Sequence, residues 1–172
     1  MNIPYLATLN TVTMRSTLSF LFCALLICGC SSELPEPTID SDDIISFDPS
    51  LAKELGADEY GMRRYVMAFL KAGPNRDQDA ETAARLQDAH MANITRLADD
   101  GKLAVAGPFL DNGELRGIYI FAVETIEEAR ELTATDPAIR AGRLEMELHP
   151  WYGSAAMMQV NEIHQQLSKT PI

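Results

Sequence analysis

Four segments of the chain have the hydrophobic pattern of β-strands. Residues 64–71 and 117–123 are apolar at every inner position, which is typical of strands buried on both faces of a sheet. A shorter apolar run, 102–107, ends at a Gly-Pro pair. Residues 143–149 alternate strictly between apolar and polar side chains. This fourth segment is therefore predicted to be an edge strand with one face toward solvent.

Helical periodicity occupies the segments between and after these strands. Helices are predicted over residues 79–100, 125–134 and 154–169, and the second of them opens with a capping box of Thr125 and Glu128. Asp136 followed by proline is predicted to cap one further turn. The apolar stripes of the first and last helices are Ala83, Leu86, Ile94 and Leu97, and Val160, Ile163 and Leu167.

The resulting order, strand-helix-strand-strand-helix-strand, is that of the split βαβ, ferredoxin-like α+β fold. In that fold the first and third strands are central, which agrees with their two-sided apolar pattern. Two helices cover only one face of such a sheet, so the other face needs a second sheet from a partner subunit or the C-terminal helix folded back over it. The residues expected to contribute to that face are Tyr65, Met67, Phe69, Tyr119 and Phe121.

The first 29 residues are predicted to be a targeting segment rather than part of the folded domain. An apolar run of ten residues, 18–27, is too short to span a membrane and has the length of a signal-peptide core. Met14-Arg15 directly before it has the form of a normal start. The run ends in Ile27-Cys28-Gly29-Cys30, which resembles a bacterial lipobox whose last cysteine, Cys30, is lipidated. A plain signal peptide or a short membrane anchor is the alternative.

The chain is thus expected to be a membrane-anchored lipoprotein. Serine rather than aspartate after Cys30 resembles lipoproteins of the outer membrane, which places the domain at the periplasmic face of that membrane in a Gram-negative host. The predicted divisions are a signal peptide over 1–29, a tether over 30–46, a short helical lead-in over 47–61, the main domain over 62–152, and a C-terminal helix and tail over 153–172.

Composition narrows the classes of function. With 172 residues, 47% of them hydrophobic, the chain has the make-up of a one-domain globular protein. Its 14 basic and 25 acidic residues give a formal charge of −11, which argues against nucleic acid as a partner. Cys23, Cys28 and Cys30 are all within the first 30 residues, so the domain offers no disulfide or thiol nucleophile. His90, His149 and His164 lack metal-ligand spacing, and no phosphate- or dinucleotide-binding glycine motif occurs, so neither metal nor cofactor is expected.

A series of short motifs occurs in order between residues 62 and 152. They are Tyr65-Val66-Met67-Ala68-Phe69, Gln87-Asp88-Ala89-His90, Asp100-Gly101-Lys102-Leu103, Ala106-Gly107-Pro108, Gly113, Gly117, Glu127-Glu128-Ala129, Asp136-Pro137-Ala138-Ile139-Arg140-Ala141-Gly142 and His149-Pro150-Trp151. The ordered set resembles the YciI-like (YCII-related) domain family. This resemblance implies a dimeric α+β barrel and a His–Asp active site at His90 and Asp136. Some relatives resemble dehydrochlorinating enzymes of aromatic degradation, and most have no known activity. The lipid anchor, tether and extra helix depart from the commonest members.

His90 and Asp136 each have a structural explanation as well as a catalytic one. His90 lies on the apolar stripe of helix 79–100 and is predicted to face the sheet, where a lone histidine is often a core residue. Asp136 is explained as a helix cap, and a carboxylate has acceptor sites for both tasks. A carboxylate on one imidazole nitrogen would leave the other for a substrate proton. That dyad suits proton abstraction, elimination or isomerisation.

Further candidates surround this pair. The two Ala-Gly-Pro strand ends, with Gly73, Pro74, Gly107 and Pro108, are candidates for a pocket mouth, although turn chemistry explains them equally well. Arg116 and Arg140 are candidates for holding an anionic substrate, with solvated surface as the alternative. Tyr65 and Trp151 are candidates for apolar pocket walls or for core packing.

Three functions are compatible with these features. The first is a small-molecule lyase or isomerase that uses His90 and Asp136. The second is a non-catalytic ligand-binding module, and the third is a structural lipoprotein. The expected partners are a second copy of the chain, the lipid membrane through Cys30 and a small molecule.

Overall fold

The computed structural model of the chain describes residues 46–111 and 113–170. The predicted signal peptide, the lipidation site Cys30 and nearly all of the tether lie outside the described residues. The described part is a mixed α/β unit with one four-stranded antiparallel sheet.

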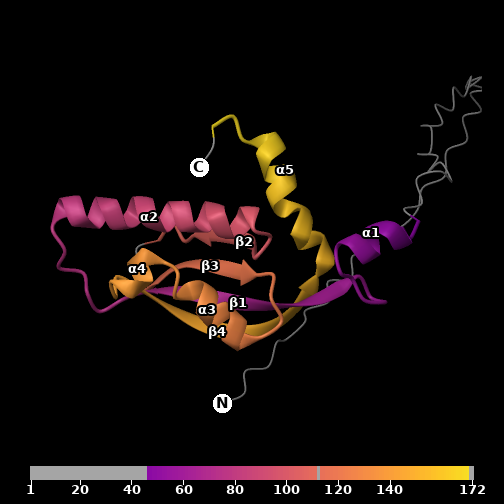
Figure 1. Cartoon of the computed structure of the whole chain (residues 1–172), viewed down its shortest axis with the longest axis horizontal. Helices are drawn as coiled ribbons and strands as arrows, with labels where there is room; N and C mark the ends of the chain where they lie inside the picture. The colour runs from indigo at the N-terminus through magenta and orange to yellow at the C-terminus, as the bar shows by residue number, and fades with distance from the viewer. Residues whose placement is uncertain (1–45, 112, 171–172) are drawn as a thin grey trace, which may run out of the picture. The chain divides into compact units, whose positions relative to one another are not determined.

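The described elements follow the predicted order (Figure 1). They are α1 (Pro49–Glu54), β1 (Met62–Ala72), α2 (Ala80–Asp99), β2 (Leu103–Pro108), β3 (Leu115–Phe121), α3 (Ile126–Thr133), α4 (Pro137–Arg140), β4 (Leu144–Ser154), the 3₁₀ helix η2 (Ala155–Gln159) and α5 (Val160–Leu167). The sheet order is β2-β3-β1-β4, so the prediction that the first and third strands are central is confirmed.

The helices begin where the sequence places acceptor side chains. Asp48 accepts hydrogen bonds from the Ser50 and Leu51 amides at the start of α1, and Asp79 accepts one from Thr82 at the start of α2. Only half of the predicted capping box of α3 forms as expected. Thr125 Oγ1 accepts from the Glu128 amide, but the Glu128 carboxylate accepts a hydrogen bond from Lys102 Nζ at 3.1 Å. The lysine at the start of β2 is near enough to attract this carboxylate away from the cap.

One face of the sheet is covered by α2 and α3 and holds the larger core. The side of β1 that faces these helices carries Val66, Ala68 and Leu70, which pack with Leu97 of α2 and Ala129 of α3. Tyr119 and Phe121 belong to this same core, since the register pairs them with Ala68 and Val66. The expectation that these two aromatic residues help to form the opposite face is wrong. Both faces of β3 are apolar, so its pattern alone does not show which side chain lies on which face.

The opposite face holds a second, smaller core. Tyr65, Ala104 and Ile120 are buried there, with Met67 and Trp151 packed against them. The Tyr65 hydroxyl donates a hydrogen bond to the Ser154 carbonyl at 2.9 Å. Two methionines of η2, Met157 and Met158, also pack on this cluster. The alternative in which the C-terminal helix folds back over this face is therefore realised in part. The segment that covers the face is η2 rather than α5.

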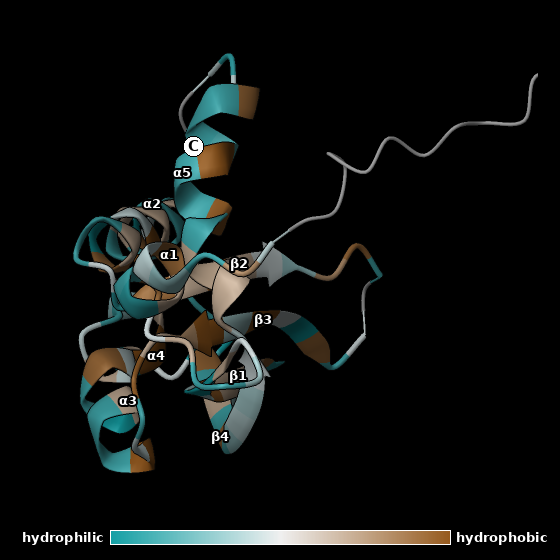
Figure 2. Ribbon diagram, turned by 90° about the vertical axis from the view of Figure 1, so that its right-hand side faces the viewer, coloured by the Kyte–Doolittle hydropathy of each residue, from teal (hydrophilic) through white to brown (hydrophobic). Residues whose placement is uncertain are grey.

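The C-terminal segment differs from the prediction at its start. Strand β4 continues to Ser154 because β1 begins at Met62 and the ladder between them runs on to the Met62–Ser154 pair. The predicted helix 154–169 is accordingly divided into η2 and α5. Its apolar stripe is exposed, with Val160 at 39%, Ile163 at 50% and Leu167 at 77%, and Figure 2 shows α5 projecting beyond the sheet. None of the helices in the described ranges has both the length and the apolar character that a membrane span requires.

The two Ala-Gly-Pro strand ends differ in their surroundings. A Cβ atom added at Gly73 would lie 2.2 Å from the carbonyl oxygen of Gly142, because the end of β1 runs against the backbone before β4. The Gly73 amide also donates to the Arg143 carbonyl at 3.0 Å. A Cβ added at Gly107 would meet nothing within 4 Å. Glycine at position 73 is thus required by close packing of two backbone segments.

Replacing Gly73 with alanine is expected to lower the free energy of unfolding by about 1–3 kcal/mol, the usual cost of forcing an atom into a packed site. Gly107→Ala is the matched control and is expected to change it far less. Urea unfolding of the full chain in a mild detergent, followed by circular dichroism, measures both. Equal effects of the two substitutions would contradict the conclusion that close backbone packing requires glycine at position 73.

Candidate functional site

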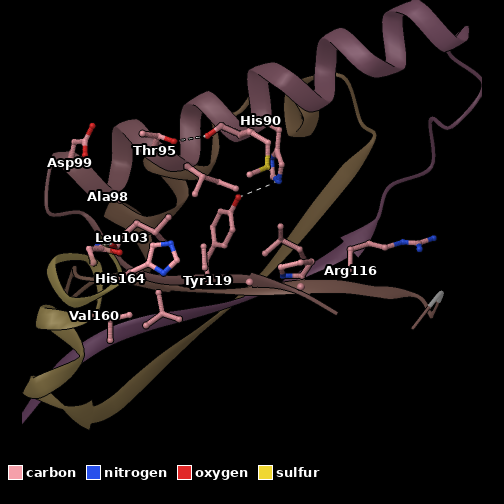
Figure 3. Close-up of a pocket in the computed structure, with 18 of the residues that line it drawn as sticks. His90, Thr95, Ala98, Asp99, Leu103, Arg116, Tyr119, Val160 and His164 are labelled. Atoms are coloured by element: carbon pink, nitrogen blue, oxygen red, sulfur yellow. Dashed lines mark hydrogen bonds between the residues drawn. The ribbon is translucent and has the colours of Figure 1, made fainter. Parts of the chain in front are cut away.

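A groove of about 1160 Å³ runs between α2, the β2–β3 part of the sheet and α5. His90, Ile94 and Ala98 line it from α2, while Leu103 and Tyr119 line it from the sheet. Figure 3 shows the side chains of these elements converging on this space. The helix-covered face of the sheet therefore carries both the main core and this groove.

His90 and Asp136 are in direct contact beside this groove. His90 Nδ1 lies 2.6 Å from Asp136 Oδ2. The His90 side chain is 9% exposed and the Asp136 side chain is fully buried. The structure thus places together the two residues that sequence analysis paired.

The second oxygen of Asp136 is used by the backbone. Asp136 Oδ1 accepts a hydrogen bond from the Ala138 amide at 2.8 Å and so caps α4. Pro137 at the first position of that helix has no N–H to satisfy. Capping and pairing therefore occur together, one on each oxygen, and the short helix α4 aims the carboxyl group at α2.

Tyr119 contacts the other nitrogen of the imidazole ring. Its hydroxyl lies 3.4 Å from His90 Nε2, and the two rings are stacked with an interplanar angle of 16°. Figure 3 shows this hydroxyl pointing from the sheet toward α2. Burial, and secondarily the charge of Asp136, raise the pKa of Tyr119 well above its ordinary value, so its hydroxyl keeps its proton at neutral pH.

The tautomer of His90 follows from these contacts. With Asp136 as the acceptor, Nδ1 carries the hydrogen and Nε2 has the free lone pair. In the free protein this lone pair faces the Tyr119 hydroxyl, and a molecule in the groove that brings a proton to Nε2 would take the place of that hydroxyl. The arrangement is chemically suited to a general base with one oriented nitrogen.

Some of the remaining candidate residues line the groove, and others do not. Gly107, Pro108 and Arg116 line the groove. In the described part of the chain, Gly73 and Pro74 do not line it, because Gly73 packs against the backbone before β4. Arg140 does not line it either, since it ends α4 with its side chain in solvent.

The two aromatic candidates for pocket walls belong to the smaller core. Tyr65 and Trp151 pack together with ring centroids 5.8 Å apart on the opposite face of the sheet. Both residues therefore pack in the core, and they also line a second hollow, which is separate from the groove beside His90.

Sequence reasoning missed three residues of the groove. Tyr119 was assigned to the wrong face, although pairing of β3 with β1 would have identified its side. Arg76 lies in the connection before α2 and Arg143 directly before β4, and both line the groove with Arg116. Their positions after a turn carry no periodic signal, so only the three-dimensional fold brings them together.

The described residues offer no ready metal site. Within residues 46–111 and 113–170, no group of three or more His, Cys, Asp or Glu side chains is placed to hold a metal ion.

Comparison with known proteins gives three findings. Residues 66–152 match the model of the YCII-related domain, a range that includes both His90 and Asp136. The uncharacterized protein YjpA of Bacillus subtilis (strain 168) is 31% identical over 62 residues, which are 36% of this chain and 71% of that protein. A solved structure of 5-chloro-2-hydroxyhydroquinone dehydrochlorinase (TftG) from Burkholderia phenoliruptrix AC1100, in complex with 2,5-dihydroxybenzoquinone, is similar with 20% identity and a TM-score of 0.39. The structural match covers 50% of this chain and 92% of the dehydrochlorinase chain.

Proposed function

The chain belongs to the family of YCII-related domains, and we propose that this member is a lyase or isomerase that moves a proton on a small molecule, with His90 as the base and Asp136 as its orienting partner. The observation that carries the proposal is the use of both imidazole nitrogens. Nδ1 is held by a buried carboxyl group at 2.6 Å, while Nε2 lies at the wall of the groove.

The first step is the transfer of a proton from an acidic carbon of the substrate to Nε2. The electron pair of the broken C–H bond forms a double bond to the substrate's carbonyl carbon, and the carbonyl π electrons move onto its oxygen to give an enolate. In an elimination, a leaving group on the neighbouring carbon departs with its bonding electrons. In an isomerisation, the imidazolium returns the proton to a different carbon.

Asp136 and Tyr119 support this step in different ways. The buried carboxylate is next to the ring that becomes positively charged, and so stabilises the imidazolium. The raised pKa of Tyr119 keeps its hydroxyl protonated. The hydroxyl is thus available to donate a hydrogen bond to the oxygen on which negative charge develops.

A second function, non-catalytic ligand binding, is favoured by one observation. The groove continues from His90 to α5, where Val160 and His164 line it. This length exceeds what a single proton transfer needs and suits a ligand that is held without reacting. The two functions share the same groove and differ in turnover.

We also propose that the domain works as a dimer of ferredoxin-like protomers. Support comes from the face opposite the helices, where Met67, Phe69 and Ile118 remain only partly buried beside the smaller core. A partner sheet laid on this face would form an α+β barrel and would bury these side chains. The bound lipid at Cys30 would hold this dimer at the periplasmic face of the outer membrane.

Deuterium exchange tests the catalytic proposal without requiring the complete reaction. The full chain in mild detergent is incubated in D₂O with small carbonyl compounds that have an acidic α-hydrogen, some with a leaving group on the next carbon. Exchange faster than in buffer is expected, and His90→Gln is expected to slow it by roughly 10²–10⁴-fold, the usual contribution of a general base.

His149→Gln is the matched control, because His149 is exposed on β4 and lies outside the residues that line the groove. It is expected to leave exchange unchanged. Compounds that shift the His90 ring resonances yet exchange no faster than in buffer would instead identify a binding protein. Full exchange in His90→Gln would contradict the assignment of the base.

The anchor has a separate test. Cys30→Ser removes the thiol that would carry the lipid, so the protein is expected to leave the membrane fraction, since each buried CH₂ of an acyl chain contributes roughly 0.8 kcal/mol. Cell fractionation with Cys28→Ser as the control measures this. A Cys30→Ser protein that stays with the membranes would overturn the anchor.

A further inference from the structure

Three arginines gather at one end of the groove, and we propose that this end binds the carboxylate of an apolar small molecule. Arg76, Arg116 and Arg143 all line the groove. They come from three separate segments, namely the connection before α2, the start of β3 and the residue before β4. This inference rests on the proposed function in one respect, since it names the substrate class of the same site.

Among residues 46–111 and 113–170, the three guanidinium groups have no acidic side chain as a partner. Arg76 Nη1 donates to the Arg143 carbonyl at 3.1 Å, and Arg143 Nη1 donates to Gln78 Oε1 at 2.9 Å. Within the described ranges, every ion pair formed at 4.0 Å or less involves other residues. A chain with 25 acidic residues and a net charge of −11 has ample carboxylates to neutralise such a cluster. None of the carboxylates that the structure describes pairs with these arginines, which leaves the positive charge of this end available to a ligand.

Unlike the Arg76 and Arg143 side chains, the Arg116 side chain makes no hydrogen bond to another described residue. Its Nε is shielded from solvent and donates to no acceptor among the described residues. A buried donor without a partner is unfavourable. Turning this guanidinium toward an anion would give its unpaired Nε an acceptor, and the Nε and Nη pair matches the two oxygens of a carboxylate.

Repulsion among the three guanidinium groups also favours the binding of an anion at this end of the groove. Desolvation, followed by the positive charges of Arg143 and Arg116, lowers the pKa of Arg76. Like charges that are held together in this way are stabilised when an anion is placed between them. An anion at this end therefore relieves a repulsion that exists in the free protein.

The position of the cluster sets the orientation of the ligand. Figure 3 shows Arg116 at the far side of Tyr119 from His164, with its side chain extended away from His90. The groove also has an apolar wall, to which Leu70, Ala138 and Leu144 contribute. A small molecule with its carboxylate at the arginines would thus present an apolar body along this wall and its reacting carbon toward His90.

Benzoate and its neutral counterpart benzamide are the probes that test this inference. Both have the same ring, and only benzoate carries the charge. Each is titrated into the full chain in mild detergent and followed by calorimetry. Benzoate is expected to bind at least about tenfold more tightly than benzamide, the scale of one charge-assisted hydrogen bond. This preference is expected to weaken at high salt.

Variants locate the site. Arg116→Gln and Arg143→Gln are expected to reduce benzoate affinity to that of benzamide, whereas Arg116→Lys keeps part of the preference and guards against loss of folding. Arg140→Gln is the control, because Arg140 is exposed outside the groove. Equal affinity for the two probes, no detectable benzoate binding, or a preference that survives both glutamine variants would each overturn the inference.

His90→Gln separates this inference from the proposed function. It abolishes the proposed base but leaves the arginines in place, so the preference for benzoate is expected to persist in it. Carboxylate preference without any exchange activity would remove the catalytic proposal alone. Exchange activity without carboxylate preference would remove the arginine site alone.

Discussion

The contact between His90 and Asp136 joins two elements that are 46 residues apart in the chain. A fully buried carboxyl group is tolerated only when its oxygens are bonded, and here one oxygen caps α4 and the other contacts α2. The short helix α4 is therefore held against the long helix α2 above the sheet. The same contact leaves one imidazole nitrogen at the groove, so the group that secures the packing also orients the candidate base.

The two ends of the groove differ chemically because different strands and strand ends supply their side chains. Tyr119 rises from the central strand β3 to contact His90 in the middle, while the start of β3 and the residue before β4 bring Arg116 and Arg143 to one end. Toward α5 the lining is mixed, with Leu103 and Val160 beside polar side chains such as Glu162 and His164. A positive end, a proton-accepting centre and an extension of mixed polarity toward α5 thus follow from one antiparallel sheet and the helices that lie on it.

Much of the fold could be predicted from the sequence because its signals are local. Two-sided apolar strands became the central β1 and β3, and Asp48, Asp79 and Thr125 cap the helices that they precede. The pairing of His90 with Asp136 could be expected only from the family resemblance, since nothing local links the two positions. The face taken by Tyr119 depended on strand register, and the extension of β4 to Ser154 depended on the length of β1. The arginine cluster is a property of the folded chain alone.

The tautomer of His90 is the most direct measure of whether Asp136 orients the candidate base. Nitrogen-15 NMR of the full chain, at a pH where the imidazole is neutral, distinguishes a hydrogen on Nδ1 from one on Nε2. In the parent chain the hydrogen is expected on Nδ1. In Asp136→Asn the amide oxygen can still cap α4 and the amide nitrogen then donates to Nδ1, so the hydrogen is expected on Nε2. The same tautomer in both proteins, or a hydrogen on Nε2 in the parent, would contradict the role assigned to this contact.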